Sequence, residues 1–83
     1  MQIKKTVVLQ EENEEAILFD SESLLTLWLN ETAIWTFKFL REGLDEKAIL
    51  EELKKSYEGV NDEELSKDIH FCIENFKQYG FVS

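Results

Sequence analysis

The N-terminal part of the chain alternates between short apolar runs and polar turns, a pattern typical of β-strands. The three runs are residues 5–10 (KTVVLQ), 16–20 (AILFD) and 24–29 (LLTLWL). The acidic patch at residues 11–15 and the polar segment 20–23 separate these runs as turns. Because such short turns join neighbouring strands, the pattern predicts an antiparallel three-stranded meander.

The third predicted strand is the most apolar part of the chain. LLTLWL contains no charged residue, although 33% of all residues are charged. Side chains alternate along a strand, so Leu25, Leu27 and Leu29 share one face, whereas Leu24, Thr26 and Trp28 share the other. In a three-stranded meander this strand lies at an edge, where an apolar strand is open to pairing with another strand. The fold itself or a partner could cover that edge.

The pattern changes to a helical period after Asn30. Residues that cap helix N-termini then alternate with glycines, which favour helix C-termini. We expect three helices, which begin after Asn30, Asp45 and Asn61 and end before Gly43, Gly59 and Gly80. Asn61 and Glu64 also have the spacing of a reciprocal capping box. The order of elements predicts an α+β fold, and 83 residues suffice for a single domain, residues 1–83, with a thin core.

The apolar positions of each predicted helix recur at spacings of three and four residues, so they define the expected core. These positions are Ala33, Ile34, Phe37 and Leu40; Ile49, Leu50, Leu53 and Tyr57; and Leu65, Ile69, Cys72, Ile73 and Phe76. Trp35 and Phe39 lie together on a different side of the first helix. Two interpretations are open: this helix is buried nearly all round, or the two rings form an aromatic patch that docks a protein.

Acidic residues outnumber basic ones by 18 to 9, which gives a net charge of −9. The segments 1–30, 31–59 and 60–83 each carry a negative net charge. Contact with a phosphate backbone therefore has no electrostatic source. No apolar run approaches the roughly 20 residues of a membrane span. The single Cys72 cannot form an internal disulfide, which suits a reducing compartment. We therefore expect a cytoplasmic protein that binds neither nucleic acid nor a membrane.

The sequence offers few residues for catalysis, which requires reactive side chains that converge. His70 and Cys72 are the only histidine and cysteine, and their spacing on a helix points them in different directions. Cys72 falls on the apolar face as a structural thiol, and His70 falls toward solvent. No metal-binding motif or phosphate-binding glycine loop occurs. We expect no enzymatic activity, no metal and no cofactor.

The third predicted helix carries an aromatic residue away from its core face. Phe71 lies about 140° from the centre of that face, at about 100° per residue. The sheet could cover this ring, or it could be exposed as a binding anchor. If the strand 24–29 lies beside this helix, the two flank a groove with an apolar wall and an unpaired backbone edge. Such a groove suits β-strand addition, in which main-chain hydrogen bonds give affinity and side-chain pockets give specificity.

Four motifs follow one another along nearly the whole chain, about residues 6–82. They are Leu29-Asn30-x-Thr32-Ala33, Phe37-x-Phe39-Leu40-x-x-Gly43, Ile49-x-x-x-Leu53-x-x-x-Tyr57, and a closing stretch with Glu64, Asp68, Ile69, Ile73, Phe76, Gly80, Phe81 and Val82. In order and spacing, they resemble the PqqD-like family, the precursor-peptide recognition elements of pathways that modify ribosomally made peptides. The family usually has tryptophan where Phe37 stands, and the spacer to Gly43 is slightly long.

The resemblance implies a winged helix-turn-helix-like fold and a non-catalytic role in natural-product biosynthesis. Members of the family bind the leader of a precursor peptide as an added strand on the third strand, packed against the third helix. They present it to a modifying enzyme, often a radical SAM protein, or to a leader peptidase in lasso-peptide pathways. The implied peptide-binding residues are Leu24, Leu25, Thr26, Leu27, Trp28 and Leu29 on the strand and Lys67, Asp68, Phe71, Glu74, Asn75 and Gln78 on the helix.

Two other functions remain open. A winged-helix transcription regulator would need a basic recognition helix, whereas the third helix sets Lys67 and Lys77 against five acidic residues. A homodimerisation domain would use the same apolar edge to pair with a second copy.

Overall fold

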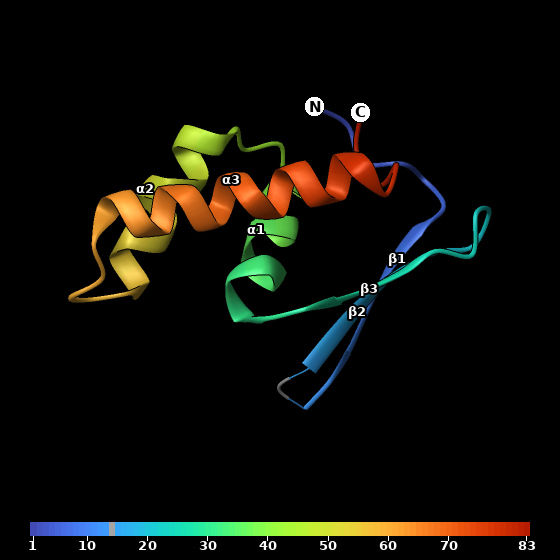
Figure 1. Cartoon of the computed structure of the whole chain (residues 1–83), viewed down its shortest axis with the longest axis horizontal. Coiled ribbons are helices and arrows are strands. Elements are labelled where there is room, and N and C mark those ends of the chain that lie inside the picture. Colours follow the sequence, from blue (N-terminus) through green and yellow to red (C-terminus); the bar gives the residue numbers. More distant parts are fainter. Residues whose placement is uncertain (14) are drawn as a thin grey trace.

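The computed structural model describes residues 1–13 and 15–83. The elements are β1 (Val7–Glu12), β2 (Glu15–Asp20), β3 (Thr26–Leu29), α1 (Glu31–Arg41), α2 (Glu46–Ser56) and α3 (Asp62–Gln78). The strands form one antiparallel sheet in the order β1-β2-β3. The helices and the two chain ends lie on one side of this sheet (Figure 1). The predicted fold class, three antiparallel strands followed by three helices, is confirmed.

The core lies between the inner face of the sheet and the helices. Leu18 and Leu29 of the sheet are buried together with the rings of Phe37, Phe76 and Phe81. Phe37 and Phe76 meet edge to face, with ring centroids 5.9 Å apart, which joins α1 to α3. Every core position predicted on α1 and α3 is buried, because the helical period places them all on the packed side.

The two ends of the chain are joined beside the sheet. Gln2 and Ser83 exchange backbone hydrogen bonds of 3.1 and 2.9 Å, and the Lys4 N–H donates to the Phe81 carbonyl at 2.8 Å. Phe81 and Val82 are both buried. The C-terminal residues therefore close the core after α3 has ended, and their apolar character has a structural reason.

Several strand boundaries differ from the predicted ones, and β1 begins at Val7, two residues after the predicted start. β1 runs to Glu12 and β2 begins at Glu15, so most of the acidic patch is strand and not turn; residue 14 lies outside the described residues. β3 begins only at Thr26, so the prediction that Leu24 and Leu25 belong to the strand is wrong. Leu24 has a φ of 68°, the left-handed conformation, which no strand residue adopts.

A β-bulge explains why β3 begins late. The Leu24 N–H donates to the Asp20 carbonyl at 2.7 Å, and the Asp20 N–H donates to the Leu25 carbonyl at 3.0 Å. Leu24 and Leu25 thus face the single residue Asp20, with the first of them left-handed. Glycine is the usual residue at such a position, so a leucine there stores backbone strain.

The buried carboxylate of Asp20 organises this turn. It accepts hydrogen bonds from the Thr6 hydroxyl (2.6 Å), the Glu22 N–H (2.9 Å), the Lys4 ammonium (3.0 Å) and the Ser23 hydroxyl (3.0 Å). The Thr6 bond contributes most, and together these donors hold the pKa of Asp20 well below its ordinary value. A charged Asp20 therefore ties the start of β1 to the turn that leads into β3.

All three predicted N-caps form. Asn30 accepts from the Ala33 N–H at 2.9 Å, and Asp45 accepts from the Ala48 N–H at 2.8 Å. Asn61 caps α3 differently from the predicted capping box: it accepts from the Glu63 N–H at 2.7 Å, one residue before Glu64. Because Asn30 directly follows β3, the capped start of α1 also fixes where that strand ends.

The helix α1 is buried over most of its circumference, including Thr36, whose hydroxyl donates to the Thr32 carbonyl at 2.7 Å. Its exposed stripe contains Trp35, which is 42% exposed and stacks on Phe39 with ring centroids 5.8 Å apart. The Lys38 ammonium lies 4.9 Å from the Trp35 ring centroid. The helix is therefore central to the core, and its aromatic pair lies at the surface.

Candidate functional site

The strand β3 lies at an edge of the sheet and pairs only with β2 in the described part of the chain. In an antiparallel pair, alternate residues direct their N–H and C=O groups toward the neighbouring strand. The bond between the Asp20 N–H and the Leu25 carbonyl sets this alternation. In the observed register, Leu27 and Leu29 therefore bond to β2, and the backbone groups of Thr26 and Trp28 point away from the sheet.

The side chains of β3 alternate as the sequence predicts. Leu29 is buried and Leu27 half-buried on the inner face, whereas Thr26 and Trp28 are exposed on the outer face. Trp28 is 70% exposed, which is far from the usual state of such a large ring. An added strand would thus meet two outward-facing backbone units, one inner apolar face and one outer indole.

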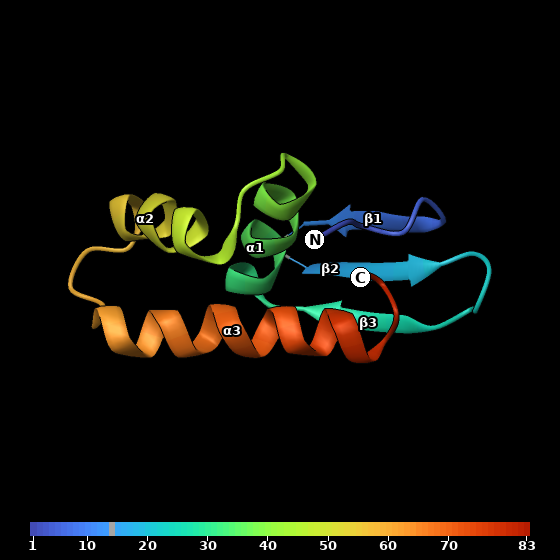
Figure 2. The same ribbon diagram turned by 90° about the horizontal axis from the view of Figure 1, so that it is seen from above.

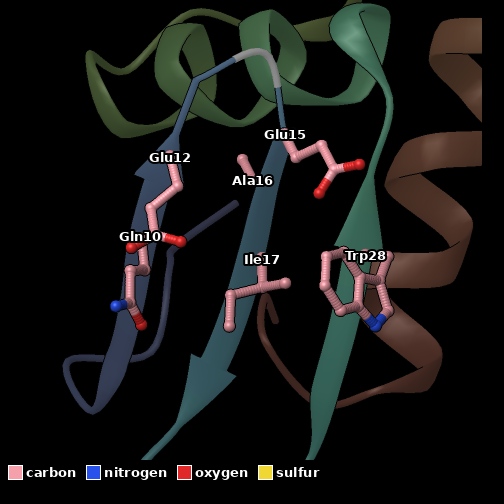
Figure 3. A pocket seen from close by; sticks show the side chains of 6 residues that line it. All are labelled: Gln10, Glu12, Glu15, Ala16, Ile17 and Trp28. Carbon is pink, nitrogen blue, oxygen red and sulfur yellow. The ribbon is translucent and has the colours of Figure 1, made fainter.

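The helix α3 flanks β3 on the side away from β2 (Figures 2 and 3). It packs on α1 and α2 through its buried face. Phe71 is 67% exposed, so the sheet does not cover it. Of the other predicted wall residues, Lys67, Asp68 and Gln78 are exposed and Glu74 and Asn75 are half-buried.

The predicted wall of α3 divides between two sides of the helix. Lys67, Phe71 and Glu74 line an open depression of about 400 Å³ with Ser66, His70 and Glu46. His70 Nδ1 lies 3.2 Å from the Glu46 carboxylate, so its side of the helix faces α2. Asp68 and Asn75 lie roughly 140–160° around the helix from His70. They are on the side turned away from α2. Phe71, at the border of the depression, lies about 100° from His70 and so between these two residues and Lys67 and Glu74.

No reactive constellation is present in the described residues. Cys72 is buried, and desolvation, with a smaller contribution from the Asp68 charge, raises the pKa of its thiol to about 11. His70 lies at the surface, as predicted, and the structure places it beside Glu46. Residues 1–13 and 15–83 contain no group of three or more side chains suited to a metal ion. No helix among them is long and apolar enough to cross a membrane.

Sequence reasoning missed which backbone groups of β3 are free. The period of two predicts the faces of the side chains, but the direction of each N–H depends on the bulge at Leu24. It also missed the apolar character of the outer sheet face, to which Ile17 and Phe19 contribute. The sequence contains the signal for this face: residues 16–19 are all apolar, so both faces of the strand carry apolar side chains.

This architecture defines a class of protein: an α+β domain with an exposed apolar strand edge beside its last helix. The sequence matches the PqqD family, described as coenzyme PQQ synthesis protein D, over residues 15–82. The chain belongs to the PqqD family, and this confirms the resemblance seen in its motifs. No curated protein matches the sequence.

Two solved structures have the same fold. One is described as TbiB1 in complex with the TbiA(beta) leader peptide; it has a TM-score of 0.87 and 17% identity, and the match covers 100% of this chain and 95% of that one. The other is a lasso peptide synthetase B1 complexed with the leader peptide, with a TM-score of 0.84 and 21% identity, over 99% and 95% of the two chains. At these identities the likeness concerns the fold alone.

Proposed function

We propose that this protein is a non-catalytic module that captures the leader of a ribosomally synthesised precursor peptide as a fourth strand on β3. It would then present the peptide to a separate modifying enzyme. The observation that carries the proposal is the free edge of β3, where the backbone groups of Thr26 and Trp28 point out of the sheet. Membership of the PqqD family, and the fold shared with two proteins whose structures contain leader peptides, support it.

Affinity comes mainly from main-chain hydrogen bonds. Thr26 and Trp28 each offer one N–H and one C=O, so an added strand forms up to four bonds with them. These bonds depend little on the leader's sequence, because every residue except proline carries both groups. They fix the register of the leader without selecting its residues, and selection falls to the side chains.

Selectivity comes from the two faces of the added strand. A leader residue opposite Leu27 directs its side chain to the inner face, toward α3. There Phe71 and the half-buried Asn75 provide an aromatic anchor and a polar group. Residues opposite Thr26 and Trp28 direct theirs to the outer face. The proposed leader therefore has an apolar residue in the middle of its strand.

The acidic surface adds a second, weaker form of selection. The chain carries a net charge of −9, and Asp68, Glu74 and Glu64 lie on α3. Lysine or arginine in the leader would be attracted toward this side, at a strength that falls as salt increases. The partner is an enzyme such as a radical SAM protein or a leader peptidase, and the reducing cytoplasm is the proposed location.

An NMR titration tests the proposal directly. The probe is the synthetic leader of a candidate precursor, chosen from any short open reading frames near the gene for this protein. We expect saturable shifts in residues 24–29 and 64–78, and slower amide exchange at Thr26 and Trp28, whose N–H groups become bonded. A leader with scrambled sequence is the control. Shifts confined to other elements would overturn the proposed site, and no binding at all would overturn the function.

The two alternatives make different predictions. A transcription regulator needs positive charge on its recognition helix, and α3 begins with Asp62, Glu63 and Glu64. A homodimer that pairs β3 with β3 would elute as a stable dimer without peptide. A concentration series in size-exclusion chromatography measures this, and we expect a monomer whose β3 edge is free.

A further inference from the structure

The outer face of the sheet has no cover in the described part of the chain. The helices and the joined chain ends lie on the opposite side (Figure 1). The register places Val8, Phe19 and Thr26 in one row across the three strands, and Gln10, Ile17 and Trp28 in the next. Val8 is 53% exposed and Trp28 is 70% exposed. Four apolar side chains therefore form a surface patch, which we call the outer patch: Val8, Ile17, Phe19 and Trp28.

The outer patch ends in a small depression with acidic residues at its rim (Figure 3). Ile17 lies between Gln10 and Trp28, and Glu12 and Glu15 stand toward the β1–β2 turn. The depression has a volume of about 120 Å³, enough for one side chain. Within residues 1–13 and 15–83 no lysine, arginine or histidine forms an ion pair with Glu12 or Glu15, although the adjacent Glu11 pairs with Lys38 at 3.0 Å. Apolar surface and unneutralised negative charge thus adjoin each other.

We infer that the outer patch docks the modifying enzyme, and this inference rests on the proposed function. The docking segment inserts an aliphatic side chain beside Trp28 and Ile17 and places a lysine or arginine against Glu12 and Glu15. Charge complementarity argues for this chemistry, because two carboxylates at the rim of an apolar depression attract a cation as well as an apolar group.

The outer patch lies next to β3, so an enzyme docked there would also reach the captured leader. Thr26 and Trp28 direct their side chains to the outer face and their backbone groups to the free edge. A leader strand on that edge would direct alternate side chains to the same outer face. An enzyme on the outer patch therefore lies beside the captured leader and contacts both at once, without competing for the hydrogen bonds of β3.

A second copy of this chain fits the patch less well. Each copy carries a net charge of −9, so association of two copies is opposed by repulsion over the whole surface. The rim carboxylates of Glu12 and Glu15 would also find no cation on the outer patch of the second copy. An enzyme with a basic, apolar segment meets neither obstacle.

The experiment uses the full chain and a purified candidate enzyme, either a radical SAM protein or a leader peptidase. The double variant Glu12→Lys/Glu15→Lys reverses the rim charge, and Ile17→Thr removes the apolar floor while keeping a β-branched residue. We expect each to weaken enzyme binding roughly tenfold or more, and the leader affinity, measured in parallel, to change less than about threefold. The control Glu42→Lys/Glu58→Lys makes the same charge change at exposed positions outside the sheet, and enzyme binding should persist.

The outcomes separate this inference from the proposed function. If the leader binds but the enzyme binds all variants equally, or does not bind at all, the docking surface is wrong and leader capture stands. If the leader does not bind the unsubstituted protein, the proposed function itself fails. A dimer that Ile17→Thr disperses would assign the outer patch to self-association and overturn the inference. Equal losses in the control pair would attribute the effect to net charge alone and overturn it too.

Discussion

The two edges of the sheet differ in how they are protected. β1 ends in Gln10, Glu11 and Glu12, and the Glu11 carboxylate pairs with Lys38 of α1 at 3.0 Å. β3 is Thr-Leu-Trp-Leu and carries no charge. Charged residues on an edge strand oppose pairing with another chain, because an incoming strand would remove those charges from water. Of the two edges, the chain protects one with charge and leaves the other apolar.

This difference favours β3 as the edge for the proposed leader binding. An unprotected apolar edge is an aggregation hazard in a protein that has no use for it. Here the edge is short and is confined between the bulge at Leu24 and the helix cap at Asn30, so few residues are available for pairing. A short, bounded edge fits a single peptide strand better than it fits extended association.

Proline substitutions in β3 test the comparison of the two edges, and they are expected to have the largest effects. Thr26→Pro removes an N–H that points to the free edge, so it should weaken leader binding about tenfold or more while the protein stays folded. Leu27→Pro removes an N–H that bonds to β2, so it should lower the free energy of unfolding by about 1–3 kcal/mol or more. Chemical denaturation and fluorescence anisotropy with labelled leader measure the two effects.

Glu11→Pro is the matched control on the protected edge. By the same alternation, the Glu11 N–H points away from β2, so its loss should leave leader affinity unchanged. Equal weakening by Thr26→Pro and Glu11→Pro would contradict the assignment of binding to β3.

Phe71→Ala tests whether α3 takes part in the binding edge. The ring is 67% exposed, so its removal should lower the melting temperature little. As an anchor for the leader it should contribute about 1–3 kcal/mol of binding free energy. Calorimetric titration and thermal melting measure both quantities. Trp35→Ala, at another exposed aromatic residue, should leave leader affinity unchanged; a large stability loss for Phe71→Ala would show that the ring is part of the core.

Asp20→Asn tests the turn that leads into β3. The pKa of Asp20 is lowered in the folded state, so its charge stabilises the protein above the unfolded value of 3.8, and this contribution is lost as pH falls through the folded pKa. The variant should melt several degrees lower at pH 7, and the difference should shrink at acidic pH below that value. Thermal melts across pH check this; a constant difference would point to packing and not to charge.

Leu24→Gly should have the smallest effect. It relieves the left-handed strain at φ 68° but makes the unfolded chain more flexible, so the free energy of unfolding should rise by less than about 1 kcal/mol. Urea denaturation measures it. The comparison is Leu25→Gly. The φ of Leu25 is not positive, so this substitution relieves no strain and should lower the free energy of unfolding. A loss at Leu24 as large as that at Leu25 would mean that the leucine side chain, and not the backbone, holds the turn.

The sequence by itself determined the local structure and most of the core. The apolar runs 16–20 and 24–29, the caps at Asn30 and Asp45, and the apolar faces of α1 and α3 all depend on neighbouring residues. The apolar edge strand was also visible as a run without charge. These features could be predicted because strand and helix periods are fixed by backbone geometry.

Only the tertiary structure decided which groups are free to bind. The direction of the Thr26 and Trp28 backbone follows from the bulge at Leu24, which depends on its bond to Asp20 across the sheet. The exposure of Phe71 and Trp28 depends on where the helices pack, because a ring at a given position is covered or free according to what lies opposite. Such contacts join residues distant in sequence, and no local pattern contains them.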